Sequence, residues 1–209
     1  MANASTKWFD RCSVLEPSFY ARDTLTVAKS LLGKILVVKV RGAMTAARIV
    51  EVEAYTGNDP AAHSFRGRTP RSAPMFEHPG RAYVYFIYGM YEMLNFVTEH
   101  EGHPGAVLIR AGEPLQGEAV IKRRRKGAAR AQWTNGPGRL CRALGVPMSY
   151  NRESLQGPKI WVLDDGFKPE SISTSPRVGI RQAVDRPWRF FITGNSFVSR
   201  VKENRGAFV

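Results

Sequence analysis

Two glutamates, Glu51 and Glu53, are the residues of this chain with the clearest capacity for chemistry. They lie in residues 46–55, whose β-branched and small apolar residues predict a strand. Side chains alternate along a strand, so Glu51, Glu53 and Tyr55 should share one face. The other face should carry the apolar side chains of Val50, Val52 and Ala54.

Two carboxylates on one strand face repel each other, so each should have a cationic partner in a protein this basic. Structural salt bridges are one explanation for the pair. A metal-dependent nuclease site is another, but it requires a third acidic ligand and a lysine at suitable spacing, and neither is evident. EDTA would separate a metal-dependent enzyme from one that needs no metal.

Residues 81–97 form the densest aromatic run of the chain and contain no proline. This composition predicts strand, with Gly89 as the only breaker. Gly89 and Met90 suit the two central positions of a tight hairpin turn, which places Tyr88 and Tyr91 opposite each other at the tip. Such a tip either packs on the core or a partner, or enters a stack of bases as a wedge.

The charge balance predicts a polyanionic partner. Lys and Arg number 31 against 18 Asp and Glu, a net charge of +13. Nucleic acid is the first candidate and an anionic membrane surface the second. No stretch has the roughly 18 consecutive apolar residues of a membrane-spanning helix, and residues 1–11 show no secretory signal. The two cysteines, Cys12 and Cys141, form no disulfide framework or metal motif, as expected in a reducing compartment.

Three segments offer donors for phosphate. The long irregular stretch 57–79 holds arginines at 66, 68 and 71, the run 122–126 is wholly basic, and Arg139 follows a Gly-Pro-Gly helix start. Each is equally explained as solvated surface or ordinary capping. His100 and His103 occupy a polar turn and are interpreted as solvated rather than metal-binding.

The remaining pattern predicts one domain over residues 17–209, preceded by a loosely held arm at 1–16. A helix capped by Asp23 or Thr24 should run to Leu32. Further strands are predicted at 34–40, 106–110, 160–163, 177–180 and 188–192, and further helices at 113–130, once past Pro114, and at 140–144.

Several ordered motifs give the chain a family resemblance that covers roughly residues 20–200. They are RIVEVEAY at 48–55, AAHS at 61–64, TPR at 69–71, MF at 75–76, YVYFIYGMY at 83–91, LIRAGEPL at 108–115, the helix start at 136–144, and the segment from RVG at 177–179 to Phe191. In these motifs the chain resembles the alkyladenine (3-methyladenine) DNA glycosylases of the mammalian alkylpurine type.

The resemblance implies a mixed α/β (α+β) domain with a curved, largely antiparallel sheet, surrounding helices and a protruding hairpin that enters DNA. It implies a monomeric repair enzyme without cofactor that binds double-stranded DNA, flips out alkylated or deaminated purines and hydrolyses the N-glycosidic bond, leaving an abasic site. Such an enzyme would be cytoplasmic in a bacterium or nuclear in a eukaryote.

Residue roles follow from the same resemblance. Glu53 would be the general base and Arg110 would help to hold the water, while Tyr88 would be the wedge. The base pocket would consist of Tyr55 on one face of the base, His63 and Tyr85 on the other, and Asn95 against the 2-amino group of guanine. Independently of the resemblance, the basic loop 57–79 and the helix start at 136–139 lead us to expect DNA backbone contacts from Arg68, Arg71 and Arg139. No metal site is implied.

The chemistry suits these groups, because cleavage builds positive charge on the sugar and a carboxylate can stabilise that charge and accept a proton from water. No motif indicates a lysine for Schiff-base chemistry, so the enzyme should be monofunctional. The turn at 98–104 is longer and richer in His and Glu than the resemblance leads us to expect. A non-catalytic nucleic-acid-binding module remains the alternative, although it gives Glu51 and Glu53 no purpose.

Overall fold

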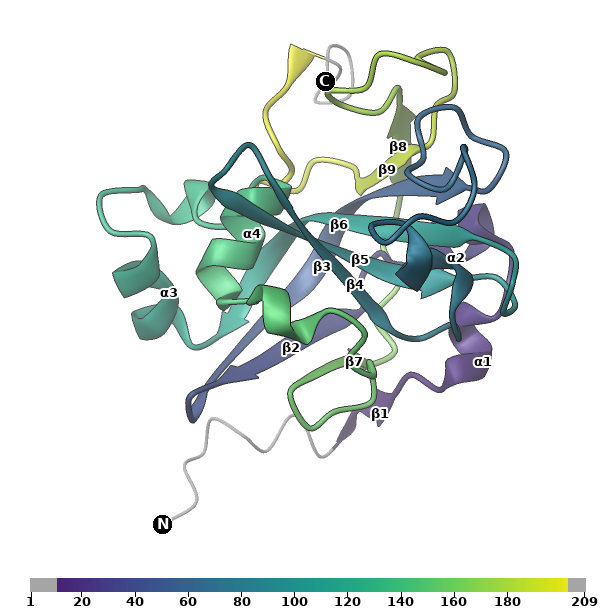
Figure 1. The fold of residues 1–209 in the computed structure, drawn as a ribbon. Helices are drawn as coiled ribbons and strands as arrows, with labels where there is room; N and C mark the ends of the chain where they lie inside the picture. Colours follow the sequence, from purple (N-terminus) through teal and green to yellow (C-terminus); the bar gives the residue numbers. More distant parts are fainter. Residues whose placement is uncertain (1–10, 203–209) are drawn as a thin grey trace.

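A single large antiparallel sheet organises the computed structural model, which describes residues 11–202 (Figure 1). Within that range the strands follow the order β1-β7-β2-β3-β6-β5-β4, and β9 joins β3 to β8. All pairings are antiparallel and the sheet is open, which confirms the predicted mixed α/β domain. The strands are β1 (Ser13–Val14), β2 (Ile35–Val40), β3 (Ala43–Thr56), β4 (Ala82–Ile87), β5 (Tyr91–Thr98), β6 (Gly105–Gln116), β7 (Ile160–Asp164), β8 (Ile172–Ser175) and β9 (Arg189–Ile192).

Strand β3 is the hub of this sheet. Along one edge it pairs with β6 over almost its whole length, and along the other with β2 and then with β9. The ladder between β3 and β6 is irregular near the point where the other edge of β3 changes from β2 to β9. There, Val50 on β3 and Arg110 on β6 have no paired residue on the opposite strand. A bulge of this kind shifts the alternation of side chains. Val50 therefore packs with Phe191 and Phe197, and the prediction that it shares a face with Val52 and Ala54 is wrong.

The helices and short 3-10 turns cover the sheet. They are α1 (Pro17–Tyr20), α2 (Thr24–Leu31), α3 (Glu118–Arg124), α4 (Pro137–Leu144), η2 (Ala73–Phe76), η3 (Arg130–Gln132) and η4 (Met148–Tyr150). The Asp23 side chain accepts from the Thr26 amide and so caps α2 as predicted. Apolar residues of α2 and α4 belong to the same core cluster as strands β2 to β6.

Two predicted elements are corrected, and most of a third lies outside the described residues. The predicted helix 113–130 is strand to Gln116 and helical only over α3, because β6 stays paired with β3 past Pro114. Residues 177–180 are irregular, and the strand of that region is β8. Residues 1–10 of the predicted arm at 1–16 lie outside the described part of the chain. In the remainder of the arm, β1 pairs with β7 and Leu15 is buried.

The tip of the β4–β5 hairpin also differs from its predicted form. Ile87 faces Tyr91 across the pair, and both Tyr88 and Gly89 have positive φ, of 54° and 68°. Two central residues with positive φ are typical of a type I′ turn, so the turn is centred on Tyr88-Gly89 rather than on Gly89-Met90. Tyr88 and Tyr91 are therefore not opposite each other.

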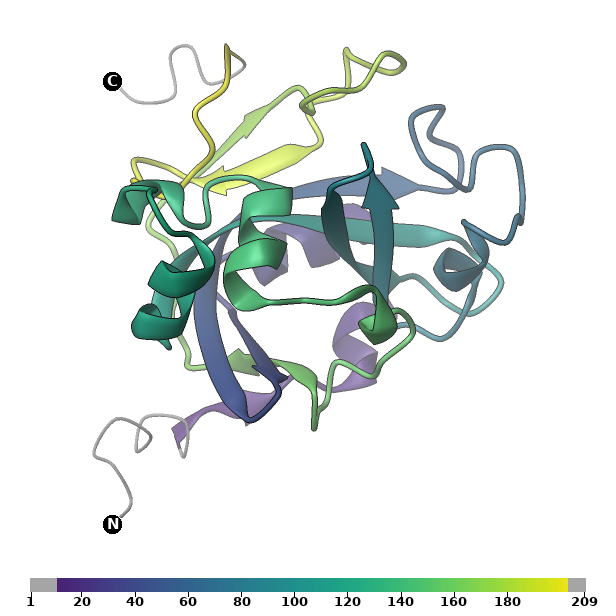
Figure 2. The same ribbon diagram turned by 60° about the vertical axis from the view of Figure 1, so that its left-hand side comes forward.

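The hairpin tip stands on the same side of the molecule as the loop that follows β3 and the segment between β8 and β9 (Figure 2). Directly below its tip, the hairpin abuts α4 at Gly138. A Cβ on Gly138 would lie 2.7 Å from the ring of Tyr91, so only glycine permits this close approach. This contact fixes α4, with its exposed arginines, beside the hairpin.

Candidate active site

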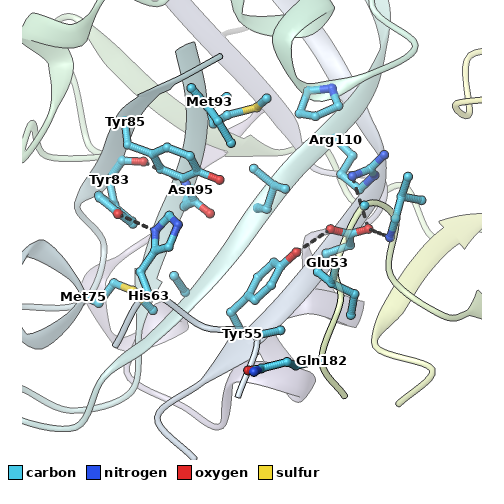
Figure 3. Close-up of a pocket in the computed structure, with 18 of the residues that line it drawn as sticks. Glu53, Tyr55, His63, Met75, Tyr83, Tyr85, Met93, Asn95, Arg110 and Gln182 are labelled. Carbon is cyan, nitrogen blue, oxygen red and sulfur yellow. Dashed lines mark hydrogen bonds and ion pairs between the residues drawn. The ribbon is translucent and has the colours of Figure 1, made fainter. Parts of the chain in front are cut away.

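A cavity of about 550 Å³ opens at the foot of the hairpin tip (Figure 3). It is lined from six segments: β3, the loop after it, the β4–β5 hairpin, β6, the first residue of α4 and residues 178–182. The volume is that of an ordinary small-molecule site and is ample for a nucleobase. The cavity brings together seven of the predicted site residues: Glu53, Tyr55, His63, Tyr85, Tyr88, Asn95 and Arg110.

Glu53 lies in the wall of this cavity and is held by three donors. Its Oε2 accepts from the Tyr55 hydroxyl at 2.8 Å, and its Oε1 accepts from the Val178 amide at 2.7 Å. Arg110 places a guanidinium nitrogen 3.2 Å from the same Oε1. All three partners donate, which is the arrangement that suits a carboxylate. Oε1 has two donors and Oε2 one, so Oε2 keeps a lone pair for a further donor such as water.

Glu51 is enclosed instead of facing the cavity. Its Oε1 lies 2.7 Å from Nε of both Arg110 and Arg189, and its Oε2 accepts from the Ser199 amide. Burial alone would raise the pKa of Glu51, but Arg110, Arg189 and Ser199 outweigh it and lower the pKa. The salt-bridge interpretation therefore holds for Glu51.

Arg110 joins the two glutamates. Burial tends to lower its pKa, but Glu53 and Glu51 raise the pKa above the ordinary value, so the guanidinium stays protonated. The predicted pair of carboxylates with cationic partners is confirmed, and the two carboxylates differ in their access to the cavity.

Aromatic rings form the rest of the wall. The Arg177 guanidinium, which is buried and paired with Asp59, lies 4.6 Å from the centre of the Tyr55 ring. Opposite Tyr55, the rings of His63 and Tyr85 meet edge to face with centroids 4.7 Å apart.

Asn95 is buried and tied to the backbone, because its amide nitrogen donates to the Tyr83 carbonyl at 3.1 Å. Its position in β5 opposite Leu108 of β6 places it at the floor of the cavity.

The hairpin tip exposes large apolar side chains above the cavity. Tyr88 is 76% exposed and Met90 63%, and Phe86 beneath them is 46% exposed. The tip thus does not fold back onto the core, which was one of the two explanations open from the sequence.

The three predicted backbone arginines lie outside the cavity lining. Arg68 is exposed in the loop after β3, and Arg71 lies over the Tyr85 ring at 5.0 Å. Arg139 is exposed on α4 and bonds the Asn135 side chain. Arg71 is therefore a neighbour of the aromatic wall as well as a surface cation.

Sequence reasoning missed several residues that shape the site. The Val178 amide fixes Glu53, Arg189 holds Glu51, and Tyr83 bonds the ring of His63. The motif at 177–179 predicts a strand, in which the amides bond neighbouring strands, whereas in the irregular chain the Val178 amide bonds Glu53. No sequence pattern indicates that Arg189 contacts Glu51, because only the pairing of β9 with β3 brings the two side chains together.

Comparison with known proteins agrees with this geometry. The model of the methylpurine-DNA glycosylase family matches residues 18–196. The chain belongs to this family. Its enzyme class is therefore that of the DNA glycosylases, hydrolases that act on N-glycosyl bonds, and the alternative of a non-catalytic binding module is set aside.

Individual relatives are similar over almost their whole length. A protein of Desulfitobacterium hafniense is 46% identical over 194 residues, covering 87% of this chain and 96% of its own. One of Methanocella arvoryzae is 44% identical, covering 90% and 96%, and one of Anaeromyxobacter dehalogenans is 47% identical, covering 89% and 86%. All three carry the provisional name 3-methyladenine DNA glycosylase. Within residues 11–202, no helix of this glycosylase has the length and apolar character needed to cross a bilayer.

We predict that Glu51→Gln destabilises this glycosylase by about 3–5 kcal/mol, because it leaves Arg110 and Arg189 buried without their common anion. Since the pKa of Glu51 is lowered in the fold, its contribution is present above the unfolded-state pKa and is lost as pH falls through the folded-state pKa. Urea unfolding at neutral and acidic pH measures both effects.

The matched control is Glu118→Gln, which removes an exposed carboxylate paired with Arg130. That change should alter the free energy of unfolding by less than about 1 kcal/mol. Equal losses for the two variants would contradict a special role for the Glu51 cluster.

Proposed function

We propose that this glycosylase extrudes 3-methyladenine and related alkylated or deaminated purines into its cavity and hydrolyses the bond to the sugar with a water activated by Glu53. The observation that carries the proposal is the setting of Glu53. It is the cavity carboxylate, it is held by three donors, and Arg110 beside it is protonated. The names of the relatives support 3-methyladenine as a substrate.

The chemistry requires one negative group next to the sugar. As the N-glycosidic bond breaks, positive charge develops on the sugar, and a fixed carboxylate stabilises it. The same carboxylate accepts the proton of the attacking water. An alkylated purine that already carries positive charge leaves readily. A neutral base such as hypoxanthine requires protonation first, and we assign no residue to that step.

The exposed hairpin tip supports an extrusion mechanism. Tyr88 projects beyond the cavity mouth, where its ring can fill the space that a flipped nucleotide leaves in the stack. The extruded base would stack on Tyr55 on one side and on the opposite aromatic wall on the other, and each such contact contributes about 1–3 kcal/mol.

A cluster of arginines beside the hairpin supports a grip on the DNA backbone. Arg139 and Arg142 project from the exposed face of α4, which abuts the hairpin at Gly138. Burial, with added repulsion from Arg139 and Arg142, lowers the pKa of the neighbouring Arg125. A site of concentrated positive charge is relieved by a bound phosphate, so we assign this cluster to the strand next to the wedge.

The composition of the cavity supports a monofunctional enzyme. Among the described residues that line it, none is a lysine, so no amine stands ready to form a Schiff base with the sugar.

Glu53→Gln should lower the rate of base release by at least about a hundredfold, because the amide can neither accept the proton nor stabilise the sugar cation. The amide is isosteric and can still accept from Val178 and Arg110, so binding of lesion duplex should persist. Single-turnover release of 3-methyladenine and a titration with labelled duplex measure the two effects. Turnover within about tenfold of the parent would remove Glu53 from this role.

Tyr88→Ser should weaken binding to lesion-containing duplex by about tenfold or more, since the side chain no longer fills the vacated stack. Tyr88→Phe is the matched control, because it keeps the ring and should bind nearly as the parent does. Affinity for an abasic single strand, which needs no wedge, should hardly change. A similar loss on duplex and single strand would argue against intercalation.

The double variant Arg139→Gln with Arg142→Gln should reduce the slope of log affinity against log salt by about 1.8, the value expected when two phosphate contacts are lost. Arg130→Gln serves as control, because that arginine is paired with Glu118. An unchanged slope in the double variant would locate the DNA backbone elsewhere.

A further inference from the structure

The Tyr55 ring has a cation on the side that is turned away from the cavity. The Arg177 guanidinium lies 4.6 Å from the centre of this ring, but Arg177 is 3% exposed and, unlike Tyr55, does not line the cavity. The same guanidinium lies 5.2 Å from the centre of the Trp188 ring. A cation over an aromatic face is attracted to it, most strongly where water is excluded. Tyr55 is therefore supported from behind, which leaves its other face to the cavity.

Two acceptors fix the plane of the guanidinium. Its Nη1 donates to the Ala54 carbonyl at 2.9 Å, and Nη1 and Nη2 both bond the buried carboxylate of Asp59. Burial tends to lower the pKa of Arg177, but Asp59 outweighs this effect and the pKa lies above its ordinary value. A charged, bidentate pair of this kind allows the guanidinium little rotation.

The remaining guanidinium nitrogen indicates that the rings also determine where Arg177 lies. Its Nε is buried and has no hydrogen-bond partner among the described residues. A buried donor without an acceptor is unfavourable and persists only where other contacts outweigh it. The contacts with Tyr55 and Trp188 supply that compensation. A salt bridge with Asp59 alone would not require the side chain to leave this donor unsatisfied.

The backbone next to Arg177 reaches the other half of the site. The Val178 amide donates to Oε1 of Glu53 at 2.7 Å, and Val178 follows Arg177 directly in the chain. Residues 176–180 belong to no helix or strand, so no ladder holds this amide in place. The amide and the guanidinium together contact three consecutive residues of β3, from Glu53 to Tyr55.

We propose that Arg177 is a positioning residue of this active site. Its guanidinium holds the Tyr55 ring from behind, and its backbone anchors the Val178 amide at Glu53. The inference rests on the proposed function for the roles of Tyr55 and Glu53 toward DNA. One side chain thus fixes the stacking surface relative to the carboxylate before a base enters, which lowers the ordering cost of binding.

The variant Arg177→Lys separates this role from that of a structural ion pair. Lysine keeps a positive charge for Asp59 but has no planar group to lie against Tyr55. Amide hydrogen exchange of the full chain without DNA, followed by NMR, should show the Val178 amide exchanging at least about tenfold faster than in the parent. Amides of the β3–β6 ladder should exchange as before. Unchanged exchange at Val178 would overturn the proposal.

Arg186→Gln is the matched control. Arg186 lies over the Trp188 ring at 4.6 Å and 3.7 Å from Asp59, so the change removes another cation of the same cluster. Exchange at Val178 should stay as in the parent. An equal increase in both variants would mean that the cluster as a whole had loosened, and would overturn the specific role of Arg177.

A second variant covers the case in which Arg177→Lys does not fold. Asp59→Asn combined with Arg177→Gln removes both charges of the buried pair together, so that neither ion is left unpaired. The same increase in exchange at Val178 is expected. An amide as protected in this double variant as in the parent would equally overturn the proposal.

A double-mutant cycle tests the action through Tyr55. In a Glu53→Gln background, which retains the base, Arg177→Lys should weaken binding of a duplex containing hypoxanthine by about fivefold, the scale of a cation–π contact. Tyr55→Leu should weaken it further. Because Arg177 acts through the ring, adding Arg177→Lys to Tyr55→Leu should cause no additional loss.

The outcomes separate this inference from the proposed function. Losses of affinity that multiply in the combined variant would overturn the action of Arg177 through Tyr55. An absence of base release by the parent chain would refute the proposed function, whereas hydrogen exchange would still decide whether Arg177 holds the Val178 amide.

Discussion

The site depends on one buried arginine shared by two carboxylates. Arg110 lies 2.7 Å from Glu51 and 3.2 Å from Glu53, and all three side chains are withdrawn from water. Ions in such surroundings are tolerated only when each is paired and hydrogen-bonded, so removing any one leaves the others at high cost. Glu51, with Arg189 and Ser199, fixes Arg110 from behind, and Arg110 in turn presents a rigid positive charge to Glu53. Glu51 therefore holds Arg110 in place, and Glu53 lines the cavity.

A second constraint is that the cavity is assembled from distant segments. The carboxylate comes from β3, the guanidinium from β6, the aromatic wall from the loop after β3 and from the hairpin, and the amide that fixes Glu53 from the irregular chain after β8. The sheet brings these segments together because β3 pairs with β6 along one edge and with β9 along the other. The chain belongs to the methylpurine-DNA glycosylase family, and these strand pairings explain how its sheet forms the cavity.

Local patterns were sufficient to predict the elements with strong apolar runs or caps. Strands β2 and β7 and helix α2 occur close to their predicted bounds, and the shared face of Glu51 and Glu53 is confirmed by their common contact with Arg110. The predicted helix 113–130 failed because its first residues are more stable in the ladder with β3 than their helical propensity suggests, since tertiary pairing outweighs local preference. The hairpin turn was misplaced by one residue because a tyrosine at positive φ is rare, and nothing in the sequence marks Tyr88 as the exception. Contacts such as those of Arg189 with Glu51 and of Tyr83 with His63 depend on strand register and on the course of a loop, which no local pattern encodes.

The irregular ladder at Val50 and Arg110 has a consequence for how the chain tolerates change. If β3 alternated strictly through residue 50, Glu51 and Glu53 would project on the side of Ile49, among the apolar residues of the main core. The extra residue shifts the alternation, so that Ile49 before it and Val52 after it both face the main core while Glu51 and Glu53 face the opposite side. An insertion or deletion of a single codon on either flank would therefore invert the polarity of half the strand, so the length of β3 is as strictly constrained as its composition.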